Sequence, residues 1–208
     1  MSGSTILTEV PEMFGAETIL MNRCRTKNEF NKTVDLINNF KKYFMRYGEK
    51  VDENPSPGNK EGGIATLEEK SLGCTQKGGT APVEDVLSYG GCVKKKGLSL
   101  LQASGNDLVA ANALAVSGAQ LILFTTGRGT PFGCSVPTLK ISSNTSLSIK
   151  KKSWIDFNTG VLLENKSMQE LTEEFFELIL KVASGEMKAK AESLDKHRLA
   201  IFKDGVTL

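Results

Sequence analysis

Two short apolar segments flank an alanine-rich segment in the middle of the chain, and this pattern constrains the fold most. The first apolar run covers residues 98–103 and the second covers residues 121–125. Residues 108–117 between them are rich in alanine and are followed by Gly118, the residue type that most often ends a helix. Because both runs are continuously apolar, each indicates a strand covered on both faces. The pattern predicts a right-handed unit in which two parallel strands are joined by a helix.

Periodic apolar segments on both sides of this unit predict further strands and helices. Residues 5–10 and 136–141 have the pattern of strands, and the tail at 199–202 fits a short edge strand. Residues 83–87 fit either a helix or a strand. Helices are predicted by capping boxes, helical spacing and terminal glycines at 16–25, 27–47, 64–72 and 168–184. The sequence therefore predicts one α/β domain over residues 1–208, three-layered and Rossmann-like, with a mainly parallel sheet.

Composition excludes several classes of protein. The net charge of +2, with lysine runs that lack interleaved aromatic residues, gives no indication of nucleic-acid binding. No window holds the roughly 18 consecutive apolar residues of a membrane span, and the first residues do not resemble a secretory signal. Four isolated cysteines and a single histidine, His197, do not fit a zinc finger. They predict idle thiols in a reducing compartment, so we expect a cytoplasmic protein.

Ligands of open parallel sheets bind beyond the carboxyl ends of the strands, and the loop at 126–133 follows such an end. Arg128 can hold a carboxylate through two parallel hydrogen bonds, and Thr126 and Thr130 can donate to its oxygens. Gly127 lets the backbone approach a ligand closely. The alternative is a tight surface turn with a solvated arginine. The loop lacks the Gly-Lys-Ser/Thr ending of a phosphate-binding loop, so nucleotide binding is the weaker interpretation.

Two further loops leave predicted strands. Glu9 and Glu12 flank the end of the first strand, where a carboxylate can act as a general base or a metal ligand. The alternative is a pair of charges at a helix N-terminus. Residues 104–107 open a helix and can bind an anion through free N–H groups, although simple capping by Ser104 or Asn106 explains them as well.

A long loop rich in proline and glycine spans residues 53–63. Asn54, Ser56 and Asn59 are candidates for contacts with substrate hydroxyls, and Lys60 is a candidate base if it is desolvated. The alternative is a rigid spacer within the domain. These residues complete the set of candidate catalytic groups, which are Glu9, Glu12, Lys60 and Arg128.

Several ordered motifs resemble those of the altronate dehydratase family. The resemblance covers the chain from about Ser4 to its end. The loops with Asn-Pro-Ser-Pro-Gly-Asn and Thr-Gly-Arg-Gly-Thr-Pro are shared with the related galactarate dehydratases, whereas Thr-Glu-Val-Pro-Glu-Met-Phe-Gly, Leu-Gly-Cys-Thr-Gln-Lys and the Gly-Val-Thr-Leu ending point to altronate. The motifs are Thr8–Glu17, Glu53–Lys60, Leu67–Lys77, Thr126–Pro131, Trp154–Phe157 and Ala200–Leu208.

The resemblance implies the C-terminal α/β domain of a longer bacterial hydro-lyase that converts D-altronate to 2-dehydro-3-deoxy-D-gluconate in hexuronate catabolism. It implies a small sugar acid as the binding partner and Fe²⁺ as the cofactor, with the metal ligands in N-terminal and middle regions that are absent from this sequence. No membrane or nucleic-acid partner is implied, and a homo-oligomer stays open. The resemblance leaves three alternatives: a galactarate dehydratase, a sulfolactate lyase of the same superfamily, or a structural domain that closes an active site built elsewhere.

Overall fold

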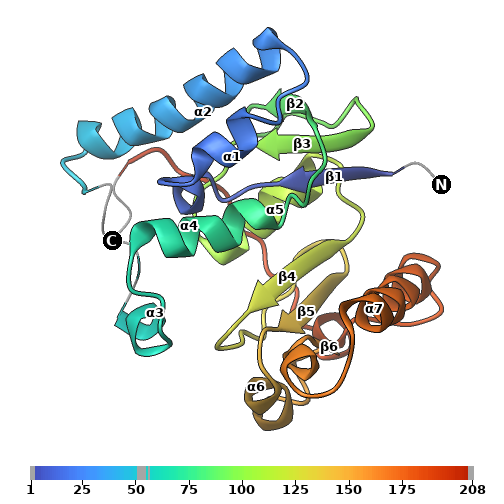
Figure 1. Ribbon diagram of the computed structural model, residues 1–208. Coiled ribbons are helices and arrows are strands. Elements are labelled where there is room, and N and C mark those ends of the chain that lie inside the picture. The colour runs from blue at the N-terminus through green and yellow to red at the C-terminus, as the bar shows by residue number, and fades with distance from the viewer. Residues whose placement is uncertain (1–2, 51–54, 56, 206–208) are drawn as a thin grey trace. The chain divides into compact units, whose positions relative to one another are not determined.

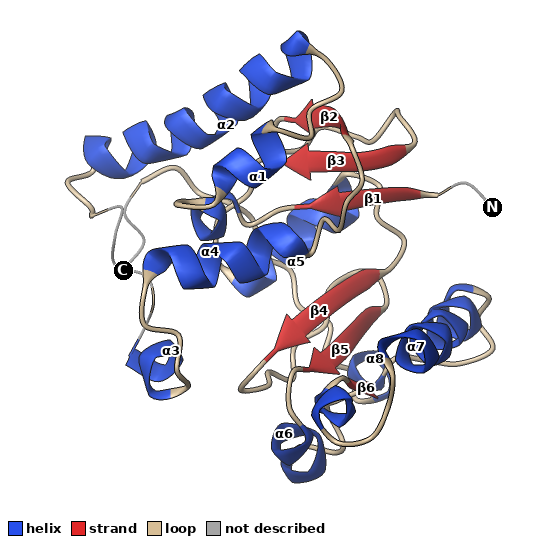
Figure 2. Cartoon of the chain, viewed as in Figure 1, coloured by secondary structure: helices blue, strands red, loops and turns tan. Residues whose placement is uncertain are grey.

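The computed structural model describes residues 3–50, 55 and 57–205. The chain divides into two compact units, of which unit 1 comprises residues 1–118 and 201–208 and unit 2 comprises residues 119–200. Each unit contains a three-stranded parallel sheet with helices (Figures 1 and 2). The predicted α/β, Rossmann-like class with parallel sheets is therefore confirmed. The prediction of one domain over the whole chain stays a prediction.

The sheet of unit 1 has the strand order β1-β3-β2, and both pairings are parallel. Its strands are β1 (Ser4–Leu7), β2 (Val83–Leu87) and β3 (Gly97–Leu101). Leu98 and Leu100 of β3 belong to one apolar cluster, whereas Leu101 belongs to a second. Because successive side chains of a strand point to opposite faces, the two clusters lie on the two faces of the sheet. The region predicted as helix or strand at 83–87 is a strand.

Helices cover both faces of this sheet. One face packs against helices that contribute Leu20, Ile37 and Cys74 to the larger cluster, whereas Ala113 packs on the opposite face. Unit 1 therefore has three layers, helices–sheet–helix, as the sequence predicts. Its helices are η1 (Val10–Met13), α1 (Glu17–Met21), α2 (Lys27–Arg46), α3 (Pro57–Glu61), α4 (Leu67–Gln76) and α5 (Asp107–Val116).

Unit 2 is built on a parallel sheet with the order β4-β5-β6. Leu139 of the central strand packs with Val182 and Ala189 from two helices. The predicted capping box is present, since Ser167 and Glu170 each bond the other's backbone N–H. The elements of unit 2 are β4 (Ile122–Thr126), β5 (Thr138–Ser142), α6 (Thr145–Lys150), β6 (Phe157–Asn158), η2 (Gly160–Leu163), α7 (Met168–Ala183) and α8 (Lys190–Ser193).

The predicted pairing of the two central strands is wrong. β3 and β4 flank α5 in the chain as expected, but β3 pairs with β1 and β2, whereas β4 pairs with β5. The boundary between the units falls between Gly118 and Ala119. Both apolar runs form strands within sheets, but the expected burial on both faces holds only for β3. β4 lies at the edge of its sheet, where Leu123 is 47% exposed. A continuous apolar run therefore specifies neither the partner of a strand nor whether both of its faces are covered.

Five further predictions about individual elements differ from the structure. β1 stops at Leu7, and α1 covers only Glu17–Met21. α4 continues through Gly73, because its buried face packs on η1 and the apolar core outweighs the weak helix propensity of one glycine. Part of the loop predicted at 53–63 forms α3, and residues 199–202 form no strand, since the Phe202 N–H donates to the Tyr89 hydroxyl (2.8 Å) instead of a ladder.

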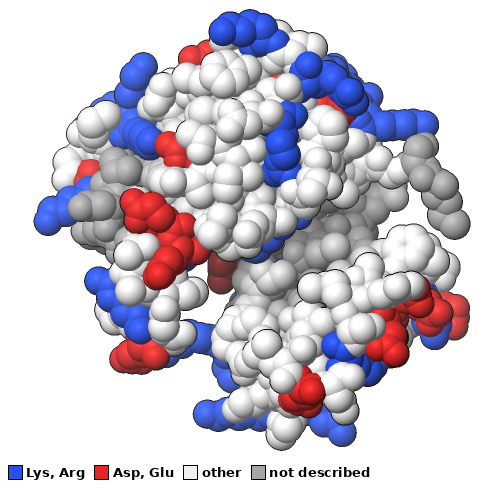
Figure 3. All heavy atoms as spheres, viewed as in Figure 1, with Lys and Arg blue, Asp and Glu red and all other residues white. Residues whose placement is uncertain are grey.

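Charged side chains of both signs are interspersed on the face shown in Figure 3. This face carries no large field of a single sign, which agrees with the small net charge of +2.

Candidate functional site

The chain leaves β1 through a residue with an unusual backbone. Glu9 has φ 67° and ψ 57°, the left-handed conformation that side-chain-bearing residues rarely adopt. The next N–H, of Val10, donates to the carbonyl of Ala103 (3.1 Å), just beyond the end of β3. The segments after β1 and β3 therefore stay side by side at the carboxyl edge of the sheet, where ligands of parallel sheets bind. Strained backbone conformations are concentrated at functional sites.

Glu12 lies against the turn that follows β3. A Cβ atom added to Gly105 would lie 3.0 Å from Glu12 Oε1, so a side chain at position 105 would displace the carboxylate or the turn. The carboxylate is also paired with Lys70, at 2.8 Å between Nζ and Oε2. Two of the three loops predicted to carry chemistry, at 9–12 and 104–107, therefore meet in unit 1.

Helix α4 presents charged and thiol groups to these two glutamates. Lys70, Cys74 and Lys77 are spaced by four and three residues, so they share one face of the helix. The Lys77 Nζ lies 3.8 Å from Oε2 of Glu9, and Lys70 pairs with Glu12. Each carboxylate therefore faces its own ammonium group. We call Glu9, Glu12, Lys70, Lys77 and Asp107 the carboxyl-edge cluster.

The electrostatics of this cluster adapt Glu9 to proton transfer. Burial is the main reason why the pKa of Glu9 is raised to about 7, and its effect is larger than the opposing effect of the Lys77 charge. The negative charges of Asp107 and Glu12 raise the pKa further. The group therefore exists in both protonation states near neutral pH, as a general acid–base catalyst requires. Burial also raises the pKa of the Cys74 thiol to about 12, so this cysteine stays protonated and is not a nucleophile.

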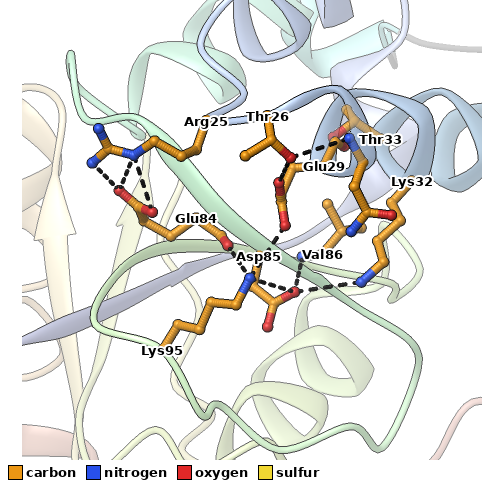
Figure 4. A network of polar contacts seen from close by, with 10 residues as sticks. Arg25, Thr26, Glu29, Lys32, Thr33, Glu84, Asp85, Val86 and Lys95 are labelled. Carbon is orange, nitrogen blue, oxygen red and sulfur yellow. Dashed lines mark hydrogen bonds and ion pairs between the residues drawn. The ribbon is translucent and has the colours of Figure 1, made fainter.

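A second charged network lies at the opposite, amino-terminal edge of the same sheet (Figure 4). Arg25 binds Glu84 at 2.5 Å, and Lys95 binds Glu29 at 3.2 Å and the Glu84 carbonyl at 2.9 Å. Hydrogen bonds from Thr26 and Lys95 hold the pKa of Glu29 well below its usual range. Carboxylates that stay ionised and paired join α2 to β2 and have no proton to exchange near neutral pH. We therefore assign this network a structural role.

The raised pKa of Glu9 predicts how stability depends on pH. The carboxyl group titrates near pH 7 in the folded chain, against 4.5 when unperturbed. Between these values the unfolded chain ionises while the folded chain stays protonated, so stability falls as pH rises and stays reduced above pH 7. We expect Glu9→Gln to increase the free energy of unfolding at about pH 8 by on the order of 1–3 kcal/mol, measured by urea denaturation. The increase should shrink as pH falls toward 4.5 and vanish below it, where both states are protonated.

Glu84→Gln is the matched control for this measurement. Arg25 holds the pKa of Glu84 below its usual range, so Glu84 is ionised in folded and unfolded chains throughout the window in which Glu9 titrates. The Glu84 variant should therefore leave the slope of stability against pH unchanged between about pH 5 and 8. Identical slopes for the wild-type chain and Glu9→Gln would contradict the buried, protonated carboxyl group.

In unit 2, the predicted carboxylate-binding loop at 126–133 is held firmly by its surroundings. The Gly129 N–H donates to Thr126 Oγ1 (2.8 Å), and Asn144 Nδ2 donates to the Gly127 carbonyl (3.2 Å). The Lys151 ammonium donates to the Arg128 carbonyl at 2.9 Å. A loop fixed through its carbonyl groups can present the side chains it carries in one geometry.

Lys140 holds the C-terminal end of this loop, at Phe132. Its side chain lies on β5, is 1% exposed, and donates to the Phe132 carbonyl. The ammonium also lies 3.9 Å from the centre of the Phe132 ring and 5.2 Å from that of Phe124. Burial of a lysine is costly unless its charge is compensated, and here a carbonyl and two ring faces compensate it.

The Arg128 side chain takes no part in the hydrogen bonds that hold this loop, in which only the carbonyl group of Arg128 is engaged. It is exposed, and among the residues that the structure describes no hydrogen bond or ion pair is made by its guanidinium group. Thr130 is half-buried and Gly127 is exposed. The backbone of the loop is thus engaged by unit 2 while its guanidinium group is exposed, and the role of Arg128 in binding a carboxylate stays a prediction.

Comparison with known proteins identifies the family. Residues 1–207 match the profile of the family described as D-galactarate/altronate dehydratase, C-terminal. The chain belongs to this family. The family membership inferred from the sequence motifs is therefore confirmed.

Individual family relatives separate clearly by identity. The chain is 59% identical over 207 residues to altronate dehydratase of Bacillus subtilis (strain 168), covering 99% of this chain and 41% of the relative. It is 55% identical to altronate dehydratase of Escherichia coli (strain K12), with 99% and 41% covered. Galactarate dehydratase (L-threo-forming) of Escherichia coli (strain K12) is 32% identical, with 96% and 39% covered. The chain thus spans about two fifths of the length of these curated relatives.

The predicted site residues on α3 are not part of the carboxyl-edge cluster. Asn59 and Lys60 are on α3, where Lys60 is exposed, so the desolvation on which its role as a base depends is not present. Asn54 and Ser56 lie outside the described residues. Sequence reasoning missed Lys70 and Lys77, although their spacing on a helix after a capping box was a usable signal.

The described residues of this family domain do not fit a metal centre. Within residues 3–50, 55 and 57–205, no three His, Cys, Asp or Glu side chains come together as metal ligands, and all four cysteines are free. The carboxyl-edge cluster pairs its carboxylates with lysines, which compete with a cation. No chemical step on these residues is therefore assigned to Fe²⁺.

Among the helices in the described ranges, none combines the length and the apolar character that crossing a bilayer requires.

Proposed function

We propose that this chain is the C-terminal part of a cytoplasmic hydro-lyase that dehydrates D-altronate to 2-dehydro-3-deoxy-D-gluconate. The observation that carries the proposal is the difference in identity, 59% and 55% to two proteins named altronate dehydratase against 32% to a galactarate dehydratase. The sugar acid is the proposed small-molecule partner. Fe²⁺ belongs to the proposal as a cofactor whose ligands lie outside this chain.

Glu9 is the proposed proton-transfer group. Dehydration takes the proton from C2 and the hydroxyl group from C3, leaving an enol that becomes the 2-keto acid. A Glu9 carboxylate can accept the C2 proton and return it to the departing C3 hydroxyl, so that water leaves and the carboxylate is regenerated. A pKa of about 7 suits both halves of this cycle, since the group gains and loses its proton near neutral pH. Lys77 and Lys70 stabilise the two carboxylates of the cluster when they are ionised.

Arg128 is the proposed carboxylate-binding residue, with Thr126 and Thr130 beside it. Removal of the C2 proton places negative charge on the substrate carboxyl group, and a guanidinium group stabilises that charge through two parallel hydrogen bonds. The exposed, unengaged guanidinium on a loop fixed by Asn144 and Lys151 supports this role.

Assay of the full-length protein with D-altronate and with galactarate, with and without added Fe²⁺, tests the proposed function. We expect formation of a 2-keto acid from D-altronate at a kcat/KM at least tenfold above that with galactarate, roughly 1.4 kcal/mol in the transition state. A preference for galactarate would show that the proposed substrate is wrong and that the proposed reaction, dehydration, is right. No dehydration of either acid would overturn the proposal in favour of a different reaction.

Replacement of Arg128 tests the carboxylate-binding role. We expect Arg128→Ala to lower kcat/KM for D-altronate by about 100-fold or more, roughly 3 kcal/mol, because the developing charge loses its bidentate partner. Arg128→Lys keeps the positive charge but cannot form two parallel hydrogen bonds, so its kcat/KM should lie between those of the wild-type enzyme and Arg128→Ala. Arg25→Ala, which removes an exposed arginine at the amino-terminal edge, is the control and should leave kcat/KM near normal. Normal kinetics of Arg128→Ala would remove this residue from the site.

A further inference from the structure

A cleft of about 590 Å³ opens beside Glu12 within unit 1. It lies between the C-terminal half of α2, the turn at 104–106 and the returning segment at 201–205. The volume is in the range of small-molecule sites, which hold a ligand between apolar walls and a few polar groups. Glu12 lines the cleft but Glu9 does not, so the cleft is a separate surface that adjoins the carboxyl-edge cluster.

One wall of the cleft is aromatic. Phe40 and Tyr43 of α2 meet Phe202 edge-on or tilted, with ring centres 6.2 Å and 5.5 Å from that of Phe202. Phe44 and Tyr47 extend the same wall along the helix. Rings in contact with one another form a rigid surface, which loses little conformational entropy when a ligand packs on it.

The returning segment at 201–205 is held in place by hydrogen bonds, so it forms an ordered wall of the cleft. The Phe202 N–H donates to the Tyr89 hydroxyl (2.8 Å), and the Tyr43 hydroxyl donates to the Gly205 carbonyl (2.9 Å). Asp204 accepts from Arg46 at 2.8 Å and from Tyr47 at 3.2 Å. Side chains of α2 therefore bind the chain after unit 2 and shape the cleft with it.

The rest of the lining is polar and rich in hydrogen-bond acceptors. Glu12 and Glu49 contribute carboxylates, and Asn106 contributes an amide whose oxygen caps α5 by accepting from Val109 N (3.2 Å). Carboxylates accept hydrogen bonds from hydroxyl groups, and the amide nitrogen of Asn106 can donate. The two carboxylates outnumber the one ammonium group of the lining, that of Lys203, and so disfavour an anionic group in the cleft. The cleft therefore matches a ligand segment that carries several hydroxyls, has C–H groups on one side, and is uncharged.

We propose that this cleft binds the uncharged, hydroxylated end of the sugar acid, with its C–H side against the aromatic wall and its hydroxyls toward Glu12 and Asn106. The inference rests on the proposed function for the identity of the substrate. Because the acceptors of the cleft select hydroxyl groups and not the carboxyl group, the cleft discriminates among sugar acids by the configuration and length of the chain. The carboxyl group of the substrate points out of the cleft.

Two valines of α5 provide a matched test in the full-length enzyme. Val109 lines the cleft, whereas Val116 lies at the other end of the same helix with 64% of its surface exposed. We expect Val109→Phe, which fills the cleft, to raise KM for D-altronate at least tenfold and to change kcat less. Val116→Phe should leave both constants unchanged. A neutral six-carbon polyol should inhibit competitively and lose at least tenfold in affinity with Val109→Phe.

Other outcomes separate the cleft from the proposed function. If the enzyme dehydrates D-altronate and Val109→Phe behaves like Val116→Phe, the cleft is not a substrate site and the proposed function stands. If no sugar acid is dehydrated while the polyol binds and Val109→Phe abolishes that binding, the proposed function fails and the cleft stands. If Val109→Phe does not fold, Tyr47→Ala, which shortens the aromatic wall, replaces it with the same expectation for KM. Competition by an apolar peptide but not by the polyol would overturn the proposal in favour of a protein segment as the occupant.

Discussion

We expect Glu9→Gln to lower kcat for D-altronate by about 100- to 10,000-fold in the full-length dehydratase, because glutamine cannot exchange a proton. The variant preserves the size of the side chain and the left-handed backbone position. The wild-type pH profile of kcat/KM should show a limb near the pKa of Glu9, about 7, with activity falling below it as the carboxylate is protonated. Rate measurements between about pH 5 and 9 should show this decrease in activity at low pH for the wild-type enzyme and not for Glu9→Gln.

The stability prediction makes this experiment unambiguous. Glu9→Gln removes a carboxyl group that folding keeps protonated against its preference, so the variant is expected to be at least as stable as the wild-type chain at neutral pH. A loss of activity therefore cannot come from unfolding. Glu17→Gln is the control, since Lys41 binds that carboxylate at 2.8 Å and the pKa of Glu17 is lowered, so it stays ionised. Full activity of Glu9→Gln, or an equal loss in Glu17→Gln, would remove Glu9 from proton transfer.

The sequence predicted the secondary structure elements better than their partners. The apolar runs at 98–103 and 121–125 indicated strands, and both are strands. Their assignment to one sheet failed because parallel pairing is decided by contacts far apart in the chain, and β3 pairs instead with β1, more than 90 residues earlier. Local apolar patterns indicate a strand, but they do not say which strand lies beside it, and the exposed residues of β4 show that they do not establish coverage of both faces.

Two carboxylates of the carboxyl-edge cluster were candidates from the sequence, whereas the two lysines that pair with them were not. Glu9 and Glu12 were identified because they follow a strand end, where parallel sheets bind ligands. The conformation of Glu9 could not be foreseen, since a glutamate in the left-handed region has no local sequence signal and is held there by the Val10–Ala103 hydrogen bond. Lys70 approaches Glu12 only because α4 packs on η1, which is a tertiary contact.

We expect Gly160→Ala to destabilise unit 2 by about 3 kcal/mol or more, since an added Cβ has no space and the clash involves backbone atoms that cannot rotate away. The new atom would lie 2.7 Å from both Cα and the carbonyl carbon of Asn144, and would also clash with the Thr145 nitrogen. Gly73→Ala is the control. It lies within α4, and a Cβ there meets nothing within 4 Å. That substitution should be neutral or stabilise by about 0.5–1 kcal/mol. Urea denaturation of both variants measures the difference.

The clash at Gly160 should also reach the carboxylate-binding loop. Asn144 caps α6 through its Oδ1, which accepts from Leu147 N (2.8 Å), while its Nδ2 holds the Gly127 carbonyl next to Arg128 (3.2 Å). A backbone shift at Asn144 therefore releases the loop on one side, and amide hydrogen exchange should rise over residues 126–133 while that of the carboxyl-edge cluster in unit 1 stays unchanged. Wild-type stability and exchange in Gly160→Ala would show that the close approach of Gly160 to Asn144 is relieved by small adjustments. The loop geometry would then not depend on a glycine at this position.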